Sequence, residues 1–357
     1  VSGSANELID RSVETRASTA AEELRAYIDG LTRNMRLLTA SPGMTDTSRA
    51  FTEGFRLLNA EDPDSLAAEK DALTRFYLDE FLPALSEVRG QPVDPTEFFP
   101  TAEAAALYLQ NTYIALNPFE GDDRRLLSNA EDDSAWTAVH VDAHPALRDI
   151  ADQLGFLDLM IVDAATQSIV YSVAKDVAFA TTLDTGPHSG STLAGLVRRV
   201  VADPKEGDVV GTDVAVYPPS GDRPTAFLAA PIFVDGTFEA VLVGAVAFDE
   251  ITAIMTSDWR AGRFGETGEM YLVGPDRRMR SDARTLLEEP DAFFSRIDEM
   301  GSVTGVDRSR MEALGTSVVF QPVDSEAAQR GIEGETGSVR TVNYLGADVL
   351  SAYVPID

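Results

Sequence analysis

The first forty residues contain the feature that most restricts the fold. From Asn6 to about Ala40 the chain has no proline. Its apolar residues recur there at alternating steps of four and three, at Ala17, Ala21, Leu24, Ile28, Leu31, Met35 and Leu38. This heptad seam predicts one continuous helix, about 50 Å long at 1.5 Å per residue, which ends at Ser41-Pro42-Gly43. The helix either packs along its own domain or pairs with a second copy in a homodimer.

Four further helices are expected between residues 48 and 155. Their sequences are SRAFTEGFRLLNA, SLAAEKDALTRFYLDEFLPAL, PTAEAAALYLQNTYIAL and SAWTAVHVDAHPALRDIADQL. Asp-Pro, Gln-Pro, Asn-Pro and Gly-Asp pairs, which are typical of turns, stand between them. The first 155 residues therefore predict a helical region.

Beyond residue 155 the pattern becomes that of strands. FLDLMIVD and IVYSVAKD, separated by AATQS, predict a hairpin. After the helical STLAGLVRRVVAD come strands in GDVVGTDVAVY, TAFLAAPIFVDG and TFEAVLVGAVAFD, the last two joined at Asp235-Gly236. GETGEMYLVGPDRRMRSDAR then predicts two strands around a Gly-Pro-Asp turn, before a helical stretch near residues 290–315 and the strand pair SVRTVNYLGADVLSAYVPID. The fold class is α+β, with a weak internal repeat of an antiparallel unit.

Composition excludes several classes of function. A chain of 357 residues is long enough for two domains. Its formal net charge of −30 argues against nucleic acid or an anionic lipid surface as partner. The absence of cysteine excludes disulfides, thiolate metal sites and thiol catalysis. No apolar run reaches the roughly 18 residues of a membrane span, and the opening VSGSANELID, without Met or signal peptide, is expected to be part of a longer chain.

Two segments carry a resemblance to a known family. LDLMIVDAATQSIVYSVAKD and GETGEMYLVGPDRRMRSDAR, behind a long helix, resemble the double Cache sensor domains of bacterial transmembrane receptors, over roughly residues 100–357. YLQNTYIALNP and AAPIFVDGTFEAVLVGAVAFDEITAIMTSD are similar to a subgroup attached to adenylate or guanylate cyclases and chemotaxis receptors. The resemblance implies two PAS-like antiparallel sheets. It implies a signalling and dimerisation helix over 1–43, a membrane-distal domain with a helical insertion over 44–257, and a membrane-proximal domain over 258–357, truncated at its C-terminus.

The function implied is that of the extracytoplasmic part of a cell-membrane receptor, with no catalysis and no cofactor of its own. A small polar molecule would bind in the distal pocket, and the long helix would carry the signal to a cytoplasmic effector. By resemblance the effector is first a nucleotide cyclase, then a chemotaxis or kinase module, and the membrane is reached through flanking segments. The Arg-x-Trp signature of amino-acid-binding Cache domains is absent, so an amino-acid ligand is not implied. The alternative is a structural or protein-binding ectodomain.

Candidate ligand-binding residues of the distal domain are Trp136, His140, Asp158, Tyr171, Lys175 and Phe227. Asp158 interrupts an apolar strand and needs a partner, either protein or ligand. Tyr171 and Lys175 would share one face of a strand because they lie at even spacing. Lys175 would either meet a carboxylate or phosphate ligand or lie at a solvated strand end.

His140 and His144 have the spacing of two metal ligands on a helix, with Asp142 between them. The following Pro145 argues against an unbroken helix at that point, so no metal site is expected.

A second set of candidates lies in the proximal domain, at Tyr271, Arg280, Ser281 and Asp282. With Arg284, these charges would either bind an anion or form a local salt-bridge network. Glu266 and Glu269 are close enough in sequence to form a pair of catalytic carboxylates, but they flank a glycine turn, where acidic residues are common for solubility. No nucleophile elbow, His-Glu-x-x-His, phosphate-binding glycine loop or kinase signature is present. The sequence therefore predicts a binding protein rather than an enzyme.

Overall fold

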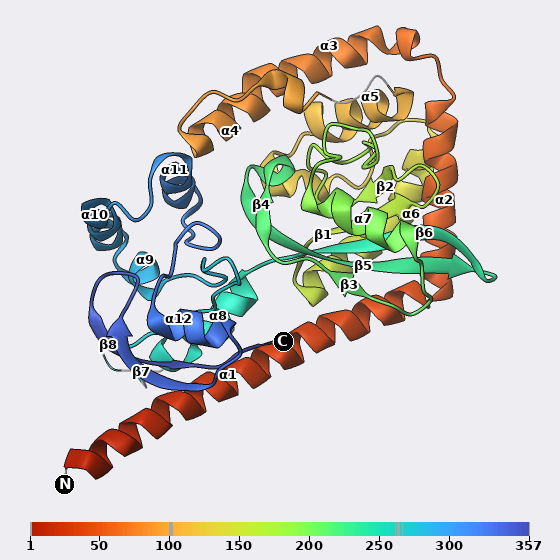
Figure 1. Ribbon diagram of the computed structural model, residues 1–357. Coiled ribbons are helices and arrows are strands. Elements are labelled where there is room, and N and C mark those ends of the chain that lie inside the picture. The colour runs from red at the N-terminus through yellow and green to blue at the C-terminus, as the bar shows by residue number, and fades with distance from the viewer. Residues whose placement is uncertain (1, 100–102, 261, 263–264, 266, 357) are drawn as a thin grey trace. The chain divides into compact units, whose positions relative to one another are not determined.

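The computed structural model describes residues 2–99, 103–260, 262, 265 and 267–356 (Figure 1). The chain divides into two compact units. The central unit consists of Leu31–Glu87 and Pro92–Ala247, and the terminal unit of Val1–Gly30, Val88–Gln91 and Phe248–Asp357. The domain boundaries expected from the sequence stand at 43/44 and 257/258, whereas the division into units falls at 30/31 and 247/248.

Helix α1 (Ser2–Thr39) is continuous, as the absence of proline predicts. The motif that ends it also begins the next helix, α2 (Pro42–Asn59). The Ser41 hydroxyl accepts a hydrogen bond from the Met44 amide (3.3 Å), and Pro42 occupies the first helical turn, where its missing N–H costs nothing. The sequence predicts Ser41-Pro42-Gly43 only as the end of the first helix, whereas in the structure it also begins the second.

The heptad seam of α1 is largely buried within the chain. Leu24 and Met35 are 1% and 0% exposed, Ala17 and Leu38 are half-buried, and Ile28 is exposed at 40%. In the terminal unit Leu24 packs in one apolar cluster with Ile251 and Met255. The seam was expected either to pack along its own domain or to pair with a second copy of the helix. For these residues the first expectation is correct.

The central unit is built on an antiparallel sheet with strand order β2-β1-β6-β5-β3, in which β4 also pairs with β5. Its strands are β1 (Phe156–Asp163), β2 (Ile169–Ser172), β3 (Val210–Gly211), β4 (Ala215–Tyr217), β5 (Arg223–Val234) and β6 (Thr237–Val246). Both predicted hairpins, β1–β2 and β5–β6, are confirmed. At the β5–β6 turn Asp235 and Gly236 both have positive φ (51° and 78°), as a tight turn matched to the strand twist requires.

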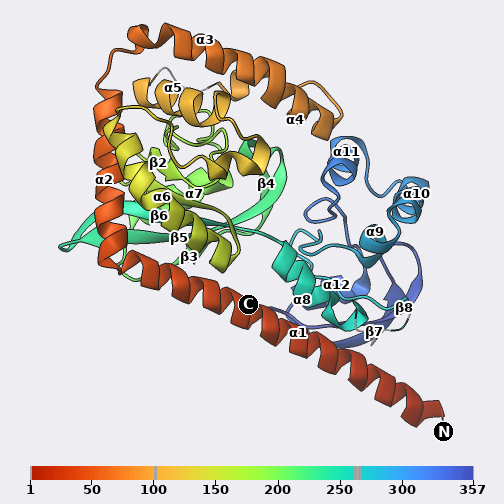
Figure 2. The ribbon, with the colours of Figure 1, turned by 180° about the vertical axis from the view of Figure 1, so that it is seen from behind.

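The predicted helices of the central unit are also confirmed. They are α2, α3 (Ala67–Phe76), the π-helix η2 (Tyr77–Phe81), α4 (Leu82–Arg89), α5 (Ala104–Gln110), the π-helix η4 (Asn111–Ala115), α6 (Ala135–Leu154) and α7 (Thr192–Ala202). Figures 1 and 2 view the sheet from opposite sides, with α7 in front of it in the first and α6 in the second. Nearly all of β1 is buried, as a strand covered on both faces should be.

Helices α2 and α6 approach each other closely at a glycine. A Cβ on Gly54 would lie 2.9 Å from the Cα of Trp136, which is too close for any side chain. Helix α6 also runs without a break through Pro145, so the sequence-based expectation of an interruption was wrong. The helix tolerates this proline and continues for nine more residues to Leu154, ending at the left-handed Gly155 (φ 70°).

The terminal unit is mainly helical apart from one small sheet. It contains α8 (Asp249–Arg260), α9 (Arg284–Glu288), α10 (Pro290–Met300), α11 (Gly305–Leu314), α12 (Glu326–Ile332) and the hairpin β7 (Gly337–Val342) to β8 (Asp348–Tyr353). Among its described residues, these are the only two regular strands. The fold is therefore α+β as expected, but a second PAS-like sheet is not confirmed.

The strand pair predicted around the Gly-Pro-Asp turn is reduced to one bridge. The turn itself is present, since the Arg277 amide donates to the Gly274 carbonyl (2.9 Å), but only Val273 and Met279 pair across it. The backbone of Met279 is shared with a second segment: its N–H donates to Gln321 and its carbonyl accepts from Val319. The segment therefore forms isolated bridges on both sides instead of a regular strand.

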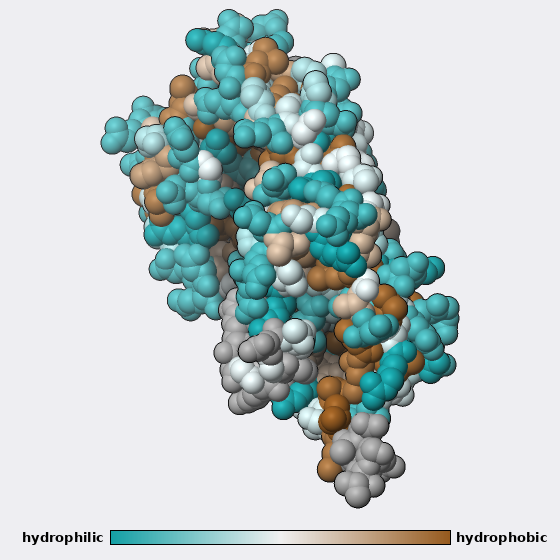
Figure 3. Space-filling model, turned by 90° about the vertical axis from the view of Figure 1, so that its left-hand side faces the viewer, coloured by the Kyte–Doolittle hydropathy of each residue, from teal (hydrophilic) through white to brown (hydrophobic). Residues whose placement is uncertain are grey.

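The face of the molecule drawn in Figure 3 is mainly hydrophilic, as expected for a chain with 59 acidic and 29 basic residues. No described helix combines the length and the apolar character that a membrane span requires.

Candidate ligand site around Lys175

Lys175 lies in the loop that follows β2, and its side chain is completely buried (0% exposed). Its backbone is left-handed, with φ of 58°. This conformation is uncommon for a residue other than glycine and is found preferentially at functional sites. Because β2 ends at Ser172, the argument that placed Tyr171 and Lys175 on one face of a strand was wrong, although the two side chains do meet.

Asp158 fixes the start of this loop. Its carboxylate accepts hydrogen bonds from the Ser172 hydroxyl (2.7 Å) and from the amides of Val173 (2.8 Å) and Ala174 (3.0 Å). The Ser172 oxygen accepts in turn from the Lys175 amide (2.8 Å). Burial raises the pKa of Asp158, and these hydrogen bonds oppose the rise. The partner that Asp158 needs is thus the protein itself.

Gln110, the last residue of α5, fixes the rest of the loop. Its amide nitrogen donates to the carbonyls of Val177 (3.0 Å) and Phe179 (2.6 Å), and its oxygen accepts from the Tyr77 hydroxyl (2.9 Å). The amide nitrogen thus holds the backbone of the loop, and the amide oxygen is held by Tyr77. The loop that carries Lys175 is therefore held from β1 on one side and from α5 on the other.

The Lys175 ammonium has few partners of its own. Among the described residues, Nζ makes one hydrogen bond, to the Ser172 carbonyl (3.1 Å). It lies 5.5 Å and 5.6 Å from the ring centres of Tyr113 and Tyr171, within range of a cation–π contact. Burial lowers the pKa of Lys175 to about 7, while Asp158 favours the charged form. An ammonium with three N–H groups is left under-satisfied here.

Aromatic side chains enclose this position on the α6 side of the sheet. Trp136 donates its indole N–H to the Val170 carbonyl (2.8 Å) and packs against Tyr113 with ring centres 4.9 Å apart. Phe51 of α2 contacts Tyr171 (4.4 Å). We call Phe51, Tyr113, Trp136, His140, His144, Tyr171 and Lys175 the Lys175 cluster.

His140 and His144 stack on one another, with ring centres 4.2 Å apart, and their partners define their tautomers. The Nδ1 atom of His140 faces the Ser128 carbonyl (3.0 Å), so Nδ1 carries the proton. For His144 the carbonyl of Arg125 faces Nε2 (2.7 Å), so Nε2 is protonated and Nδ1 accepts from the Tyr171 hydroxyl (2.7 Å). Burial lowers the pKa of both imidazoles, to about 3 for His144, and both are neutral near pH 7.

One polar atom of the cluster has no partner. His140 is 0% exposed, and no described group donates to its Nε2 atom. Because Nδ1 holds the ring proton, Nε2 is a bare acceptor. Leaving a buried acceptor unsatisfied costs about 1–3 kcal/mol. No described group of three His, Asp, Glu or Cys side chains is placed to hold a metal, and Asp142 is exposed.

The predicted site residues divide between the two faces of the sheet. Trp136, His140, Tyr171 and the Lys175 ammonium come together on the α6 side. The strand register places Asp158 on the opposite face from Tyr171. Met160 pairs with Ser172 and Ile161 with Tyr171, and Asp158, two residues before Met160, shares the face of Met160 because side chains alternate.

Phe227 does not join the Lys175 cluster. Its strand position pairs with Ala245, as does that of Asp158, so Phe227 lies on the Asp158 face, where its ring contacts Tyr217 (5.0 Å).

Sequence reasoning missed Tyr113 and misjudged His144. Tyr113 lies in η4, a π-helix, and such insertions are frequent at functional sites but have no reliable sequence signal. Its hydroxyl donates to Thr137 (2.8 Å), whose own hydroxyl donates to Asp132 (2.9 Å). His144 was considered only as a metal ligand. His140 and His144 are four residues apart and therefore lie on one face of a helix, and this spacing could have indicated that their rings stack.

The second set of predicted residues has its polar atoms engaged inside the terminal unit. Arg280 pairs with Asp276 (2.9 Å) and its guanidinium covers Gly274, where a Cβ would meet it at 2.2 Å. The Ser281 hydroxyl accepts from the Leu272 amide (2.9 Å). Asp282 accepts from Thr316 (2.7 Å) and from the Ser317 amide (2.8 Å). These contacts favour a structural network over an anion site.

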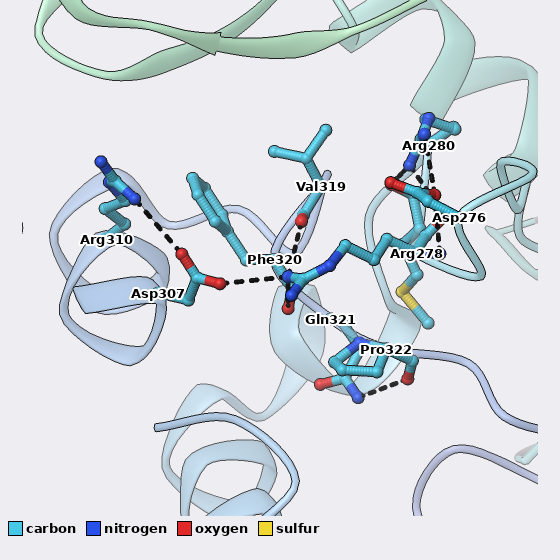
Figure 4. Close-up of polar contacts among 10 residues, drawn as sticks. Asp276, Arg278, Arg280, Asp307, Arg310, Val319, Phe320, Gln321 and Pro322 are labelled. Atoms are coloured by element: carbon cyan, nitrogen blue, oxygen red, sulfur yellow. Dashed lines mark hydrogen bonds and ion pairs between the residues drawn. The ribbon is translucent and has the colours of Figure 1, made fainter. Parts of the chain in front are cut away.

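Figure 4 shows the neighbouring Arg278 engaged in the same way. Its guanidinium donates to Asp307 (3.1 Å) and to the carbonyls of Val319 (3.0 Å) and Phe320 (3.1 Å). Val319 is left-handed (φ 61°), which is costly for a β-branched residue, and these hydrogen bonds hold it there.

Tyr271 and Glu269 are also held by internal partners. Tyr271 packs edge-on against Tyr344 (5.3 Å), whose hydroxyl donates to Glu269 (2.9 Å). Burial raises the pKa of Glu269. Glu266, the other carboxylate considered, lies outside the described residues.

Two surface hollows lie elsewhere. One, of about 520 Å³, is in the terminal unit and is lined mainly by residues of α1, together with Ser257 and Met270. The other, of about 200 Å³, is in the central unit and includes Arg199, Asp203 and Lys205. No residue predicted as a ligand contact lines either hollow.

Comparison with models of known protein families gave no match, and comparisons with curated proteins and with solved structures gave no significant match.

Proposed function

We propose that this chain is the extracytoplasmic sensing part of a transmembrane receptor of the Cache type, and that a small anionic molecule binds at the Lys175 cluster of the central unit. The full protein would then carry a cytoplasmic effector, with a nucleotide cyclase as the first candidate and a chemotaxis or kinase module as the second. The chain itself performs no catalysis in this proposal. The support comes from the resemblance of its segments and from the chemistry of the cluster.

The observation that carries the proposal is the burial of Lys175. Removing an ammonium from water is expensive unless it is paired, and no described carboxylate forms an ion pair with Nζ. Lysine is also rare in this chain, where Lys70, Lys175 and Lys205 are the only three among 29 basic residues. A lysine can lose its charge when buried, which arginine cannot do. These facts favour a site that is neutral when empty and charged when an anion binds.

The surrounding charges also favour an anion. Arg125 and Arg148 place positive charge near Lys175 and lower its pKa further, while Asp158 acts in the opposite sense. Asp158, the nearest acid, is occupied by three hydrogen bonds. An anion that entered the cluster would meet donors that are not already committed.

A sensor also requires a way to pass on the binding event. Helix α1 is one uninterrupted helix that contributes residues to both units, and α2 follows it after two residues. Phe51 of α2 contacts Tyr171 and Trp136 directly. A ligand that moved these rings would therefore act on α2 and, through residues 40–41, on α1. A ligand shifts such an equilibrium only by its different affinity for the two states.

A thermal-shift screen of the purified chain tests this proposal. Small carboxylates, inorganic phosphate, sulfate, amines, purines and sugars are compared at equal concentration. A ligand present at 100 times its Kd adds about 2.7 kcal/mol to the free energy of unfolding. We expect small anions to raise the melting temperature of the wild type and to have no effect on Lys175→Met, which keeps the length of the side chain but not its charge.

Lys205→Met is the matched control. Lys205 pairs with Asp203 at the surface, with 63% of its side chain exposed, so this variant should keep the full response to the ligand. If no small anion stabilises the wild type, or if Lys175→Met responds as the wild type does, the proposed site is wrong. A response to proteins alone would then favour a partner-binding ectodomain.

A further inference from the structure

We infer that the ligand of the Lys175 cluster carries an uncharged hydrogen-bond donor beside its anionic group, as a 2-hydroxycarboxylate does, with the anion on Lys175 Nζ and the hydroxyl donating to His140 Nε2. This inference rests on the proposed function. It names the chemical class of the ligand from two side chains that have unused hydrogen-bonding capacity.

The acceptor half of the site is defined by His140. Its Nδ1–H is committed to the Ser128 carbonyl, and stacking between Trp136 (5.0 Å) and His144 (4.2 Å) fixes the plane of the ring. The ring therefore cannot turn to offer a proton. Nε2 faces the interior as a lone-pair acceptor without a donor. A simple carboxylate has only acceptor atoms and cannot satisfy it.

The donor half is the Lys175 ammonium. Both Nζ and the His140 ring contact the same two tyrosines: Tyr113 lies 5.5 Å from Nζ and 4.8 Å from the imidazole centre, and Tyr171 lies 5.6 Å and 6.1 Å from them. The bare acceptor and the under-satisfied donor thus belong to side chains that pack against the same two tyrosine rings. A molecule of a few heavy atoms that has an anion and a donor on adjacent carbons matches this arrangement.

The donor should be neutral rather than an ammonium. A 2-amino acid would bring its positive group toward His140, where Lys175, Arg125 and Arg148 already supply positive charge. Asp158, the acid whose charge acts on Lys175, is already hydrogen-bonded by Ser172 and the loop amides. The neutral imidazole accepts equally well from a hydroxyl, which adds no charge.

Three ligands with the same carbon skeleton separate these alternatives. L-lactate, propionate and L-alanine differ only in the group on carbon 2, which is hydroxyl, hydrogen or ammonium. Calorimetric titration of the whole chain with each gives the dissociation constants. Satisfying a buried acceptor is worth about one hydrogen bond, so we expect lactate to bind at least about 10-fold more tightly than propionate. L-alanine should bind more weakly than lactate.

His140→Phe provides the second measurement, because it keeps the stacked ring but removes Nε2. In this variant lactate and propionate should bind within about 3-fold of each other, with propionate unchanged from the wild type. Propionate binding as tightly as lactate to the wild type overturns the inference but leaves the Lys175 site standing. Tightest binding by L-alanine, or no measurable binding of lactate, also overturns it. The proposed function fails separately, if no anion of the wider screen stabilises the chain.

Discussion

Lys175 is the residue on which the account of this protein depends, and its loop is placed by hydrogen bonds rather than by a strand. The Ser172 hydroxyl joins the Asp158 carboxylate to the Lys175 amide, and this fixes the left-handed turn. The side chain then enters an aromatic enclosure where its charge is poorly compensated. The protonation of Lys175 should therefore affect how the free energy of unfolding depends on pH.

The free energy of unfolding should rise with pH between about 7 and 10.5. In the unfolded chain Lys175 titrates near 10.5, and in the folded chain burial lowers its pKa to about 7. Between these values the unfolded state binds more protons, so stability increases with pH, by up to about 1.4 kcal/mol per unit. Denaturant titrations at pH 7, 8 and 9 measure the slope.

Lys175→Met should remove that rise. Burial keeps the pKa of Tyr113 and Tyr171 above 10, so these phenols do not titrate in the same window. Equal slopes for the wild type and the variant would mean that Lys175 is charged and solvated in the folded protein, contrary to this account.

At the scale of elements, the helices and the central strands follow from the period of apolar residues, and the loops do not. The pattern of residues 134–154 predicts α6, and the short runs of apolar, strand-forming residues in 156–163 and 237–249, bounded by turn residues, predict β1 and β6. The loop after β2 could not be predicted in this way. Its path depends on Gln110 and Asp158, side chains distant in sequence that bond to its backbone.

The candidate site could be predicted only in part for the same reason. Tyr171, Trp136 and His140 are large residues in regular elements, so their type and position were informative. Phe227 has the same character, but the register that places it on the other face is set by pairing between strands. The position of Tyr113 is set by a π-helix, which the sequence does not reveal. The unpartnered Nε2 of His140 results from the hydrogen bond between Nδ1 and the Ser128 carbonyl, which the sequence does not reveal either.

The close approach of α2 and α6 gives a prediction for this scale. Gly54→Ala puts a methyl group 2.9 Å from the Cα of Trp136, so the helices must separate, and we expect a loss of about 1–3 kcal/mol in the free energy of unfolding. Gly43→Ala, in the same helix, meets no atom within 4 Å and should stay within about 1 kcal/mol of the wild type. Equal stabilities of the two variants, measured by urea denaturation, would show that α2 is not packed against α6 at this point.

At the scale of the whole chain, the two units differ in how much of the expected sensor architecture they contain. The central unit has the antiparallel sheet and the enclosed polar cluster, whereas the described part of the terminal unit has a two-stranded sheet and a network of engaged arginines. The heptad seam of α1 is used within the chain at Leu24 and Leu31, so a homodimer through α1, which stays an expectation, would need other residues of the helix.

The most direct test of the central claim, that an anion charges Lys175 when it binds, is to measure proton uptake by calorimetry. L-lactate is titrated into the wild type at pH 8 and at pH 6, each in two buffers that differ in ionisation enthalpy. Because burial lowers the pKa of Lys175 to about 7, the empty site is mostly neutral at pH 8 and mostly charged at pH 6. We predict uptake approaching one proton per ligand at pH 8 and much less at pH 6. Binding without proton uptake at pH 8, or the same uptake in Lys175→Met, would contradict the account.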